Sequence, residues 1–167
     1  MNRQKYMKNT AKHIAVNAIV AGLYVVLTMP FGTLSVNPVV QIRLGEALTI
    51  LPCLLPYTAW GLAVGCAISN LVSSFGVLDV VLGSVITFIS AICTAQFKKR
   101  FYLAPLPPIL LNAIFLPVVW YFAGGGNWQL YFAQCLGLLV SQSIVLYALG
   151  IPLYFVSKKR LLPLIGE

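Results

Sequence analysis

Charged residues are almost absent from two long stretches of this sequence. Residues 13–97 contain only three Asp, Glu, Lys or Arg side chains, Arg43, Glu46 and Asp79, and residues 101–157 contain none. Soluble domains carry about 25% charged residues, whereas this chain is 8% charged and 60% hydrophobic. So few charges cannot cover a water-soluble surface. The sequence therefore predicts an all-α integral membrane protein and excludes soluble enzymes and nucleic-acid-binding proteins.

The positions of the basic residues predict the topology. Most of the eleven lie in three clusters: Arg3, Lys5, Lys8 and Lys12; Lys98, Lys99 and Arg100; Lys158, Lys159 and Arg160. Short basic segments stay on the cytoplasmic side, so an even number of spans should separate each pair of clusters. A helical span needs about 20 residues. The 85 residues between Lys12 and the middle cluster fit four spans, and the 57 between the middle cluster and Lys158 fit two. We therefore expect six transmembrane helices with cytoplasmic N and C termini.

Two of the expected spans are short. The single domain, residues 1–167, should have spans near 13–29, 46–57, 60–73, 78–97, 106–123 and 128–155. The second and third are too short for a hydrocarbon core of about 30 Å at about 1.5 Å per residue, and the second contains Pro52 and Pro56. Irregular backbone at this depth is tolerated only where protein or a water-filled cavity surrounds it. We therefore expect a cavity near the outer face.

The three charged residues within the apolar region are candidates for a binding site. A charge at the centre of a bilayer costs about 2.5–3.5 kcal/mol even on lenient scales. Glu46 opens the second span and Arg43 precedes it by three residues, so the two either form an ion pair at a helix start or face a ligand. Asp79 opens the fourth span, where it acts either as an N-cap or as a ligand contact.

Neutral polar and aromatic residues extend the candidate site. Asn70, Asn112 and Gln142, with Ser141 and Gln134, either join helices by hydrogen bonds or converge on a planar, hydrogen-bonding solute. Trp120 belongs either to an aromatic belt at the membrane interface or to a site where it stacks on a flat ring.

Two strips of small residues predict close helix contacts. One comprises Ala15, Ala18 and Gly22, and the other Gly61 and Gly65. Small residues let neighbouring helices approach to backbone distance. Internal packing explains such strips, but six helices should not need two, so one of them is a candidate for contact with a partner protein.

Catalytic and metal-binding motifs are not apparent. The sequence has no Ser-His-Asp set, no HExxH and no GxxxxGK[ST] motif, so the chain should not hydrolyse ATP by itself. The four cysteines have no metal-ligand spacing and are expected to be buried free thiols. We expect no enzymatic activity, no metal and no cofactor.

Several segments resemble one family of membrane proteins. The small six-helix chain with a basic N-terminal segment resembles the substrate-specificity (S) subunits of energy-coupling-factor (ECF) transporters. Within that group it resembles the QueT family, thought to import queuosine precursors. The matching segments are Val40–Thr49 (VQIRLGEALT), Gly65–Leu71 (GCAISNL), Leu78–Ser84 (LDVVLGS), Leu111–Ala113 (LNA) and Leu149–Leu153 (LGIPL). Relatives often have an acid where this chain has Gln142, which leaves the charge of the ligand open.

The resemblance implies a division of labour. Such a subunit captures its solute outside a prokaryotic cell membrane, under a lid made by the first outer loop, here Phe31–Val40. It then docks on a membrane coupling subunit that carries two ATPases, and Ala15, Ala18 and Gly22 would form the docking face. A 7-deazaguanine such as 7-aminomethyl-7-deazaguanine, or queuine, would be the ligand.

Other functions remain open from the sequence. One is an S subunit for a different vitamin-like solute, and a second is a stand-alone secondary transporter, which would usually show more spans or an inverted repeat. A third is a membrane enzyme or assembly factor, which would need a second acid, base or metal cluster that the sequence lacks.

Overall fold

The structure is entirely helical in the residues it describes. The computed structural model describes residues 3–30, 42–73, 76–123 and 126–165, and these contain no strand. The prediction of an all-α chain is therefore confirmed. The helices are α1 (Arg3–Thr28), η2 (Leu44–Cys53), η3 (Pro56–Thr58), α2 (Ala59–Asn70), α3 (Gly76–Ala95), η4 (Phe101–Leu103), α4 (Leu106–Ala123), α5 (Trp128–Val145), η5 (Leu146–Gly150), α6 (Ile151–Val156), η6 (Ser157–Leu161) and α7 (Leu162–Ile165).

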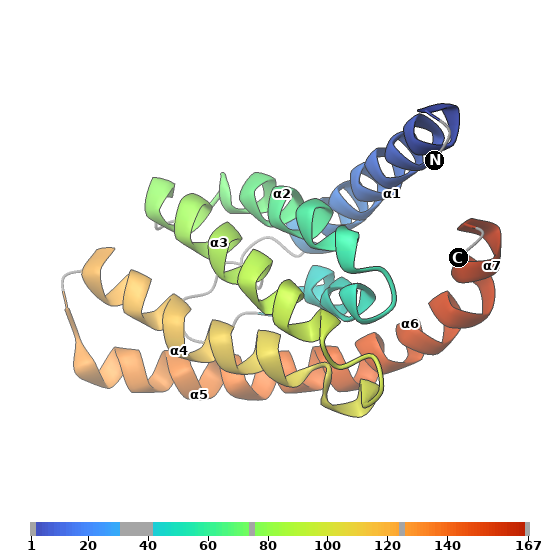
Figure 1. Ribbon diagram of the computed structural model, residues 1–167. Helices are drawn as coiled ribbons and strands as arrows, with labels where there is room; N and C mark the ends of the chain where they lie inside the picture. The colour runs from blue at the N-terminus through green and yellow to red at the C-terminus, as the bar shows by residue number, and fades with distance from the viewer. Residues whose placement is uncertain (1–2, 31–41, 74–75, 124–125, 166–167) are drawn as a thin grey trace.

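Neighbouring helices in the sequence are also neighbours in space. Helix α1 packs on α2, α2 on α3, α3 on α4 and α4 on α5 (Figure 1). The short η2 helix lies among them and contacts α1, α3, η5 and α6. From α5 to α7 the chain continues as one long curved helical rod (Figure 1).

In the described residues, four helices are long and apolar enough to cross a membrane. These four are Thr10–Thr28, Gly76–Ala95, Phe101–Phe122 and Trp128–Leu161. The 10-residue η2 is a 3₁₀ helix, about 20 Å long at about 2.0 Å per residue, and the 12-residue α2 is about 18 Å long at about 1.5 Å per residue. Both are short of the roughly 30 Å hydrocarbon core, as the sequence predicts.

Helix η2 is enclosed by protein. Every residue from Gly45 to Cys53 is buried, including the polar Glu46 and Thr49. Backbone groups approach it closely on two sides. A Cβ atom on Gly45 would lie 2.8 Å from the Tyr24 carbonyl oxygen, and one on Gly150 would lie 3.4 Å from the Ala47 carbonyl oxygen. This enclosure explains how irregular backbone and Pro52 are tolerated at membrane depth.

The two small-residue strips have different surroundings. Gly61 and Gly65 lie against α1: the Gly61 N–H donates to the Asn17 side-chain oxygen at 2.6 Å, and a Cβ atom on Gly65 would lie 2.9 Å from the Ala21 carbonyl oxygen. By contrast, Ala18 and Gly22 are exposed, and a Cβ atom on Gly22 would meet nothing within 4 Å. The Gly61–Gly65 strip is therefore internal packing.

This contrast predicts opposite effects of adding one methyl group. Gly65→Ala should lower the free energy of unfolding by about 1–3 kcal/mol, because α1 and α2 must move apart. Gly22→Ala should leave stability unchanged or raise it by up to about 1 kcal/mol through helix propensity. Unfolding of the two purified variants in mixed micelles measures the difference, and equal stabilities would contradict the close α1–α2 contact.

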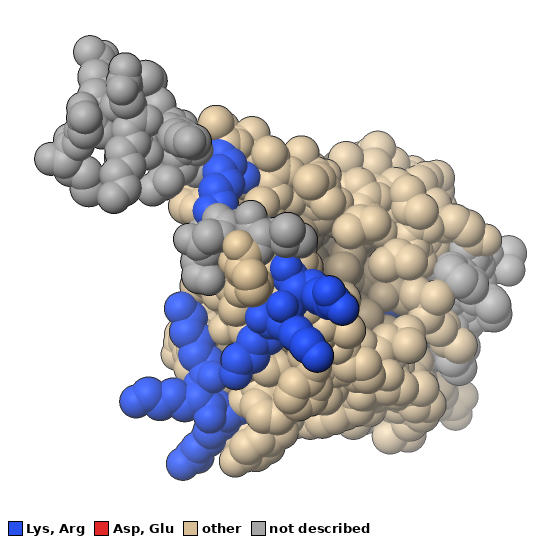
Figure 2. Space-filling model, turned by 90° about the vertical axis from the view of Figure 1, so that its right-hand side faces the viewer, with Lys and Arg blue, Asp and Glu red and all other residues tan. Residues whose placement is uncertain are grey.

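Basic residues gather at one end of the molecule. Both termini lie at the right-hand end of the view in Figure 1. Figure 2 views that end and shows Lys and Arg side chains gathered on it. The side chains of Lys98–Arg100 and Lys158–Arg160 are exposed. The two basic clusters and both termini therefore lie at the same end of the molecule, as the prediction of one cytoplasmic side for all of them requires.

Candidate functional site

Glu46 lies buried at the start of η2 and accepts hydrogen bonds from two other helices. The Tyr24 hydroxyl on α1 donates to its Oε1 at 2.5 Å, and the Asn112 side-chain amide on α4 donates to its Oε2 at 3.4 Å. Glu46 is 2% exposed and Tyr24 is fully buried. A carboxylate has about four lone-pair sites, so Glu46 keeps capacity to accept further hydrogen bonds.

Asp79 lies within the first turn of α3 and is fully buried. The Trp120 indole N–H donates to its Oδ1 at 3.1 Å. A guanidinium nitrogen of Arg43 lies 3.7 Å from its Oδ2. Because α3 begins at Gly76, Asp79 is three residues inside the helix. The N-cap interpretation of Asp79 is therefore wrong, and Arg43 forms an ion pair with Asp79.

The polar groups of these residues come together around the start of η2. Asn70, at the end of α2, donates from its side-chain amide to the Asp79 carbonyl oxygen at 2.9 Å. Arg43 and Glu46 are joined by a backbone hydrogen bond of 3.1 Å. The cluster, which we call the polar cluster, comprises Tyr24, Arg43, Glu46, Asn70, Asp79, Asn112 and Trp120. It draws on five different elements and is hidden from solvent.

Two buried amide oxygens, one in the polar cluster and one on α5, have no hydrogen-bond partner in the described part of the chain. Within the described residues, neither Asn112 Oδ1 nor Gln142 Oε1 accepts a hydrogen bond, although both side chains are only 1–2% exposed. A buried polar atom left without a partner costs about 1–3 kcal/mol. These oxygens are therefore positions where a bound molecule with N–H or O–H donors would find acceptors.

Trp120 is 2% exposed and takes part in this network, so the aromatic-belt interpretation is wrong for it. Trp60 and Trp128 are 64% and 62% exposed, which suits side chains at a membrane interface.

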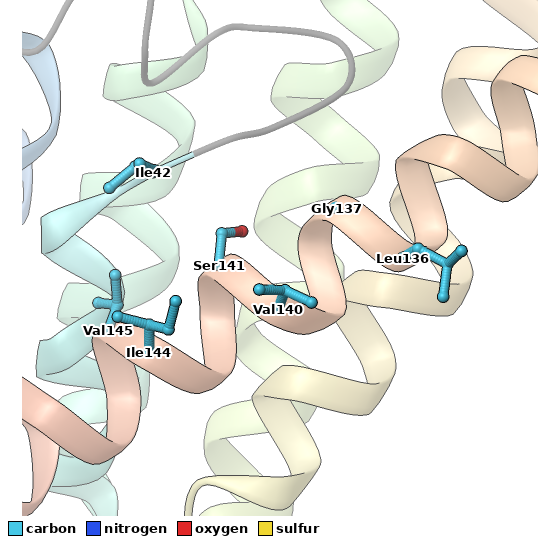
Figure 3. A pocket seen from close by; sticks show the side chains of 7 residues that line it. All are labelled: Ile42, Leu136, Gly137, Val140, Ser141, Ile144 and Val145. Atoms are coloured by element: carbon cyan, nitrogen blue, oxygen red, sulfur yellow. The ribbon is translucent and has the colours of Figure 1, made fainter.

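A cavity of about 380 Å³ lies between α5 and the segment that leads into η2. Figure 3 shows its side chains along α5, with Ile42 on the facing segment. The lining residues are Ile42, Leu136, Gly137, Val140, Ser141, Ile144 and Val145. The cavity is apolar except at Ser141. The candidate residues Arg43 and Gln142 follow Ile42 and Ser141 directly in the sequence, but they do not line it.

Tyr24 was not predicted as a member of the polar cluster. A tyrosine in the middle of an apolar helix must find a partner for its hydroxyl group when it is buried, and this was the available signal. Cys66 was expected only as a buried thiol. It is free and buried, as expected, and its sulfur accepts from Thr87 at 3.3 Å and Asn70 at 3.6 Å. No group of three potential metal ligands occurs in the described part of the chain.

The expected outer lid, Phe31–Val40, falls within residues 31–41, which are outside the described residues.

Comparison with protein-family models matches residues 14–159 to the QueT transporter family. Searches of curated proteins and of solved structures gave no match. The family match covers most of the chain, and the described residues include four apolar helices able to cross a membrane. The chain is therefore a multi-pass membrane protein that belongs to the QueT transporter family.

Proposed function

We propose that this chain is the substrate-binding subunit of an ATP-driven ECF transporter that imports a queuosine precursor across a prokaryotic cell membrane. Membership of a transporter family supports a transport role rather than an enzymatic one. The sequence has no ATP-binding motif, so a membrane coupling subunit and two ATPase subunits would supply the energy.

The observation that carries the proposal is a buried polar cluster with one more acid than base. In their ordinary ionised forms Glu46 and Asp79 contribute two negative charges and Arg43 one positive charge, which leaves one negative charge among buried side chains. Asp79 already has Arg43 as its ion partner. Glu46 is therefore our choice for the ligand-binding acid, because an uncompensated buried charge is stabilised by a cation or by several donors.

A 7-deazaguanine has groups that complement this cluster. Its guanine-like edge offers adjacent N–H donors, and a carboxylate accepts two such bonds side by side. An aminomethyl substituent adds a positive charge. In this proposal Glu46 accepts the donors, while Asn112 and Gln142 offer their open oxygens and Asn70 adds edge contacts. Trp120 and the Arg43–Asp79 pair form the edge of the site.

A binding titration of the purified chain tests the substrate class. The ligands would be guanine, which is neutral, and 7-aminomethyl-7-deazaguanine and queuine, which both carry an amine. We expect at least tenfold tighter binding of the amines, because the buried cluster carries a net negative charge. Equal or tighter binding of guanine would contradict a cationic ligand. No binding of any of the three would favour an S subunit for another vitamin-like solute.

Glu46→Gln should weaken binding of 7-aminomethyl-7-deazaguanine by about 2 kcal/mol or more, because buried donors lose a charged acceptor. This corresponds to roughly thirtyfold in the dissociation constant, at about 1.4 kcal/mol per tenfold. Tyr24→Phe is the matched control: it removes the donor to Oε1 but keeps the negative charge, so its effect should be smaller. Unchanged affinity in both Glu46→Gln and Asp79→Asn would remove these acids from the site.

The assembly is tested separately from the ligand. The face of α1 that carries Ala15, Ala18 and Gly22 is exposed, as a docking surface for a coupling subunit requires. Purification under mild conditions should retain a membrane coupling subunit and two ATPases. Uptake by the chain alone in liposomes would instead favour a stand-alone secondary transporter.

A further inference from the structure

A second hollow, unrelated to the polar cluster, lies at the surface of the helix bundle. It is an apolar groove of about 210 Å³ between α1, η2, η3 and the α6–η6 segment. Aliphatic side chains make up its lining except at Thr58 and Ser157. The Thr58 hydroxyl donates to the Leu55 carbonyl oxygen at 2.7 Å. The Ser157 hydroxyl is buried and has no hydrogen-bond partner within the described residues.

The groove is aligned with the helices and begins near the basic end of the molecule. On α1 its lining extends from Val16 to Leu23, and on the α6–η6 segment from Leu161 back to Leu153. Figure 1 shows that α1 and the α6–α7 segment both extend toward the end on which Figure 2 shows the Lys and Arg side chains. The apolar lining therefore leads inward from a cationic surface.

Two cations are close in sequence to residues that line the groove at its end nearer the basic surface. Lys12 precedes Val16 by four residues and so lies on the same face of α1. Arg160 is next to Leu161, which lines the groove, and is exposed. The Ser157 hydroxyl, which has no hydrogen-bond partner in the described residues, belongs to the same side of the lining, one helical turn from Leu161.

We propose that this groove binds one acyl chain of an anionic phospholipid from the leaflet at the basic end. The phosphate would contact Lys12 and Arg160, and the Ser157 hydroxyl would donate to an ester oxygen of the glycerol region. The lining favours a lipid chain, because aliphatic side chains from α1, η2 and the α6–η6 segment line a groove that follows the helices. The charges favour an anionic headgroup, since basic pockets between helices on the cytoplasmic side bind such headgroups.

The test is lipid retention by the purified full-length chain. Protein in mild detergent would be mixed with equal amounts of phosphatidylglycerol and phosphatidylcholine and examined by native mass spectrometry. We expect one phosphatidylglycerol per chain, retained at least tenfold over phosphatidylcholine. Lys12→Gln with Arg160→Gln should abolish this preference, and Leu23→Trp, which fills the groove, should prevent retention of either lipid.

Val140→Trp is the matched control, because it adds the same side chain at the other apolar cavity, beside α5, and should leave lipid retention unchanged. Thermal unfolding identifies variants that fail to fold. If Leu23→Trp fails to fold, the double variant Lys12→Gln with Arg160→Gln still tests the proposal. Equal retention of the two lipids by the wild type would overturn the proposal. Unchanged retention in a folded Leu23→Trp variant, together with lost binding of coupling subunits, would assign the groove to a protein partner and overturn it too.

Discussion

The double change Ala18→Trp with Gly22→Trp is expected to abolish ATP-driven uptake while leaving solute affinity within roughly threefold, which is less than 1 kcal/mol. Both positions are exposed on α1, and a Cβ atom at Gly22 has nothing within 4 Å. The free subunit therefore has room for bulky side chains there. A docked partner would be held away from the helix backbone, and packing along the whole strip would be lost.

Measuring uptake and affinity on the same purified variant separates capture from transport. The control is Ile114→Trp, at a site on α4 that is 50% exposed and lines neither of the two cavities; it should retain uptake. Full uptake in the Ala18–Gly22 variant would place the docking surface elsewhere. Loss of binding together with uptake would show that the strip supports the fold of the free subunit.

The second large effect concerns the buried ion pair. Asp79→Asn should lower the free energy of unfolding by about 3–5 kcal/mol, because the Arg43 guanidinium, 2% exposed, loses its charged partner 3.7 Å away. Asparagine keeps a side-chain oxygen that can accept from the Trp120 indole N–H, so the change isolates the charge.

The double variant Arg43→Met with Asp79→Asn should recover most of this loss, since it removes both charges from the interior. Unfolding in mixed micelles, without ligand, compares wild type, single and double variants. A single variant as stable as wild type would show that the ion pair contributes nothing to the fold. A double variant less stable than the single would show that Arg43 has a stabilising role independent of Asp79.

The membrane class and the helical segments were predictable because they depend on local composition. A long stretch with few charged residues can adopt only a few folds in a membrane, since backbone polar groups in lipid must be satisfied within helices or closed barrels. The basic clusters divided the apolar sequence into segments whose lengths fit whole numbers of spans, and the four described helices that are long enough to cross a membrane fall in these segments. The shortness of η2 and α2 was also predictable, because Pro52, Pro56 and the surrounding polar residues limit their length.

The candidate site was predictable as a set of residue types but not as a set of partners. Charges within an apolar sequence are costly, so Arg43, Glu46 and Asp79 stood out at once. The ion pair that they form was not predictable. Sequence proximity favoured an ion pair between Arg43 and Glu46, whereas α3 places Asp79 next to Arg43. Trp120 likewise lies near the end of its helix, where an interface position was the natural expectation, yet its indole N–H reaches Asp79 inside the bundle.

The sequence by itself determined that this protein is a helical membrane protein with a few buried polar groups. Only the tertiary structure decided that Gly61 and Gly65 pack against α1 while Ala18 and Gly22 stay exposed, and that Tyr24 donates to Glu46. The physical reason is the range of the interactions. Hydropathy and helix length depend on residues that are neighbours in the sequence. The partner of a buried donor or of a small-residue strip depends on how helices distant in the sequence pack together.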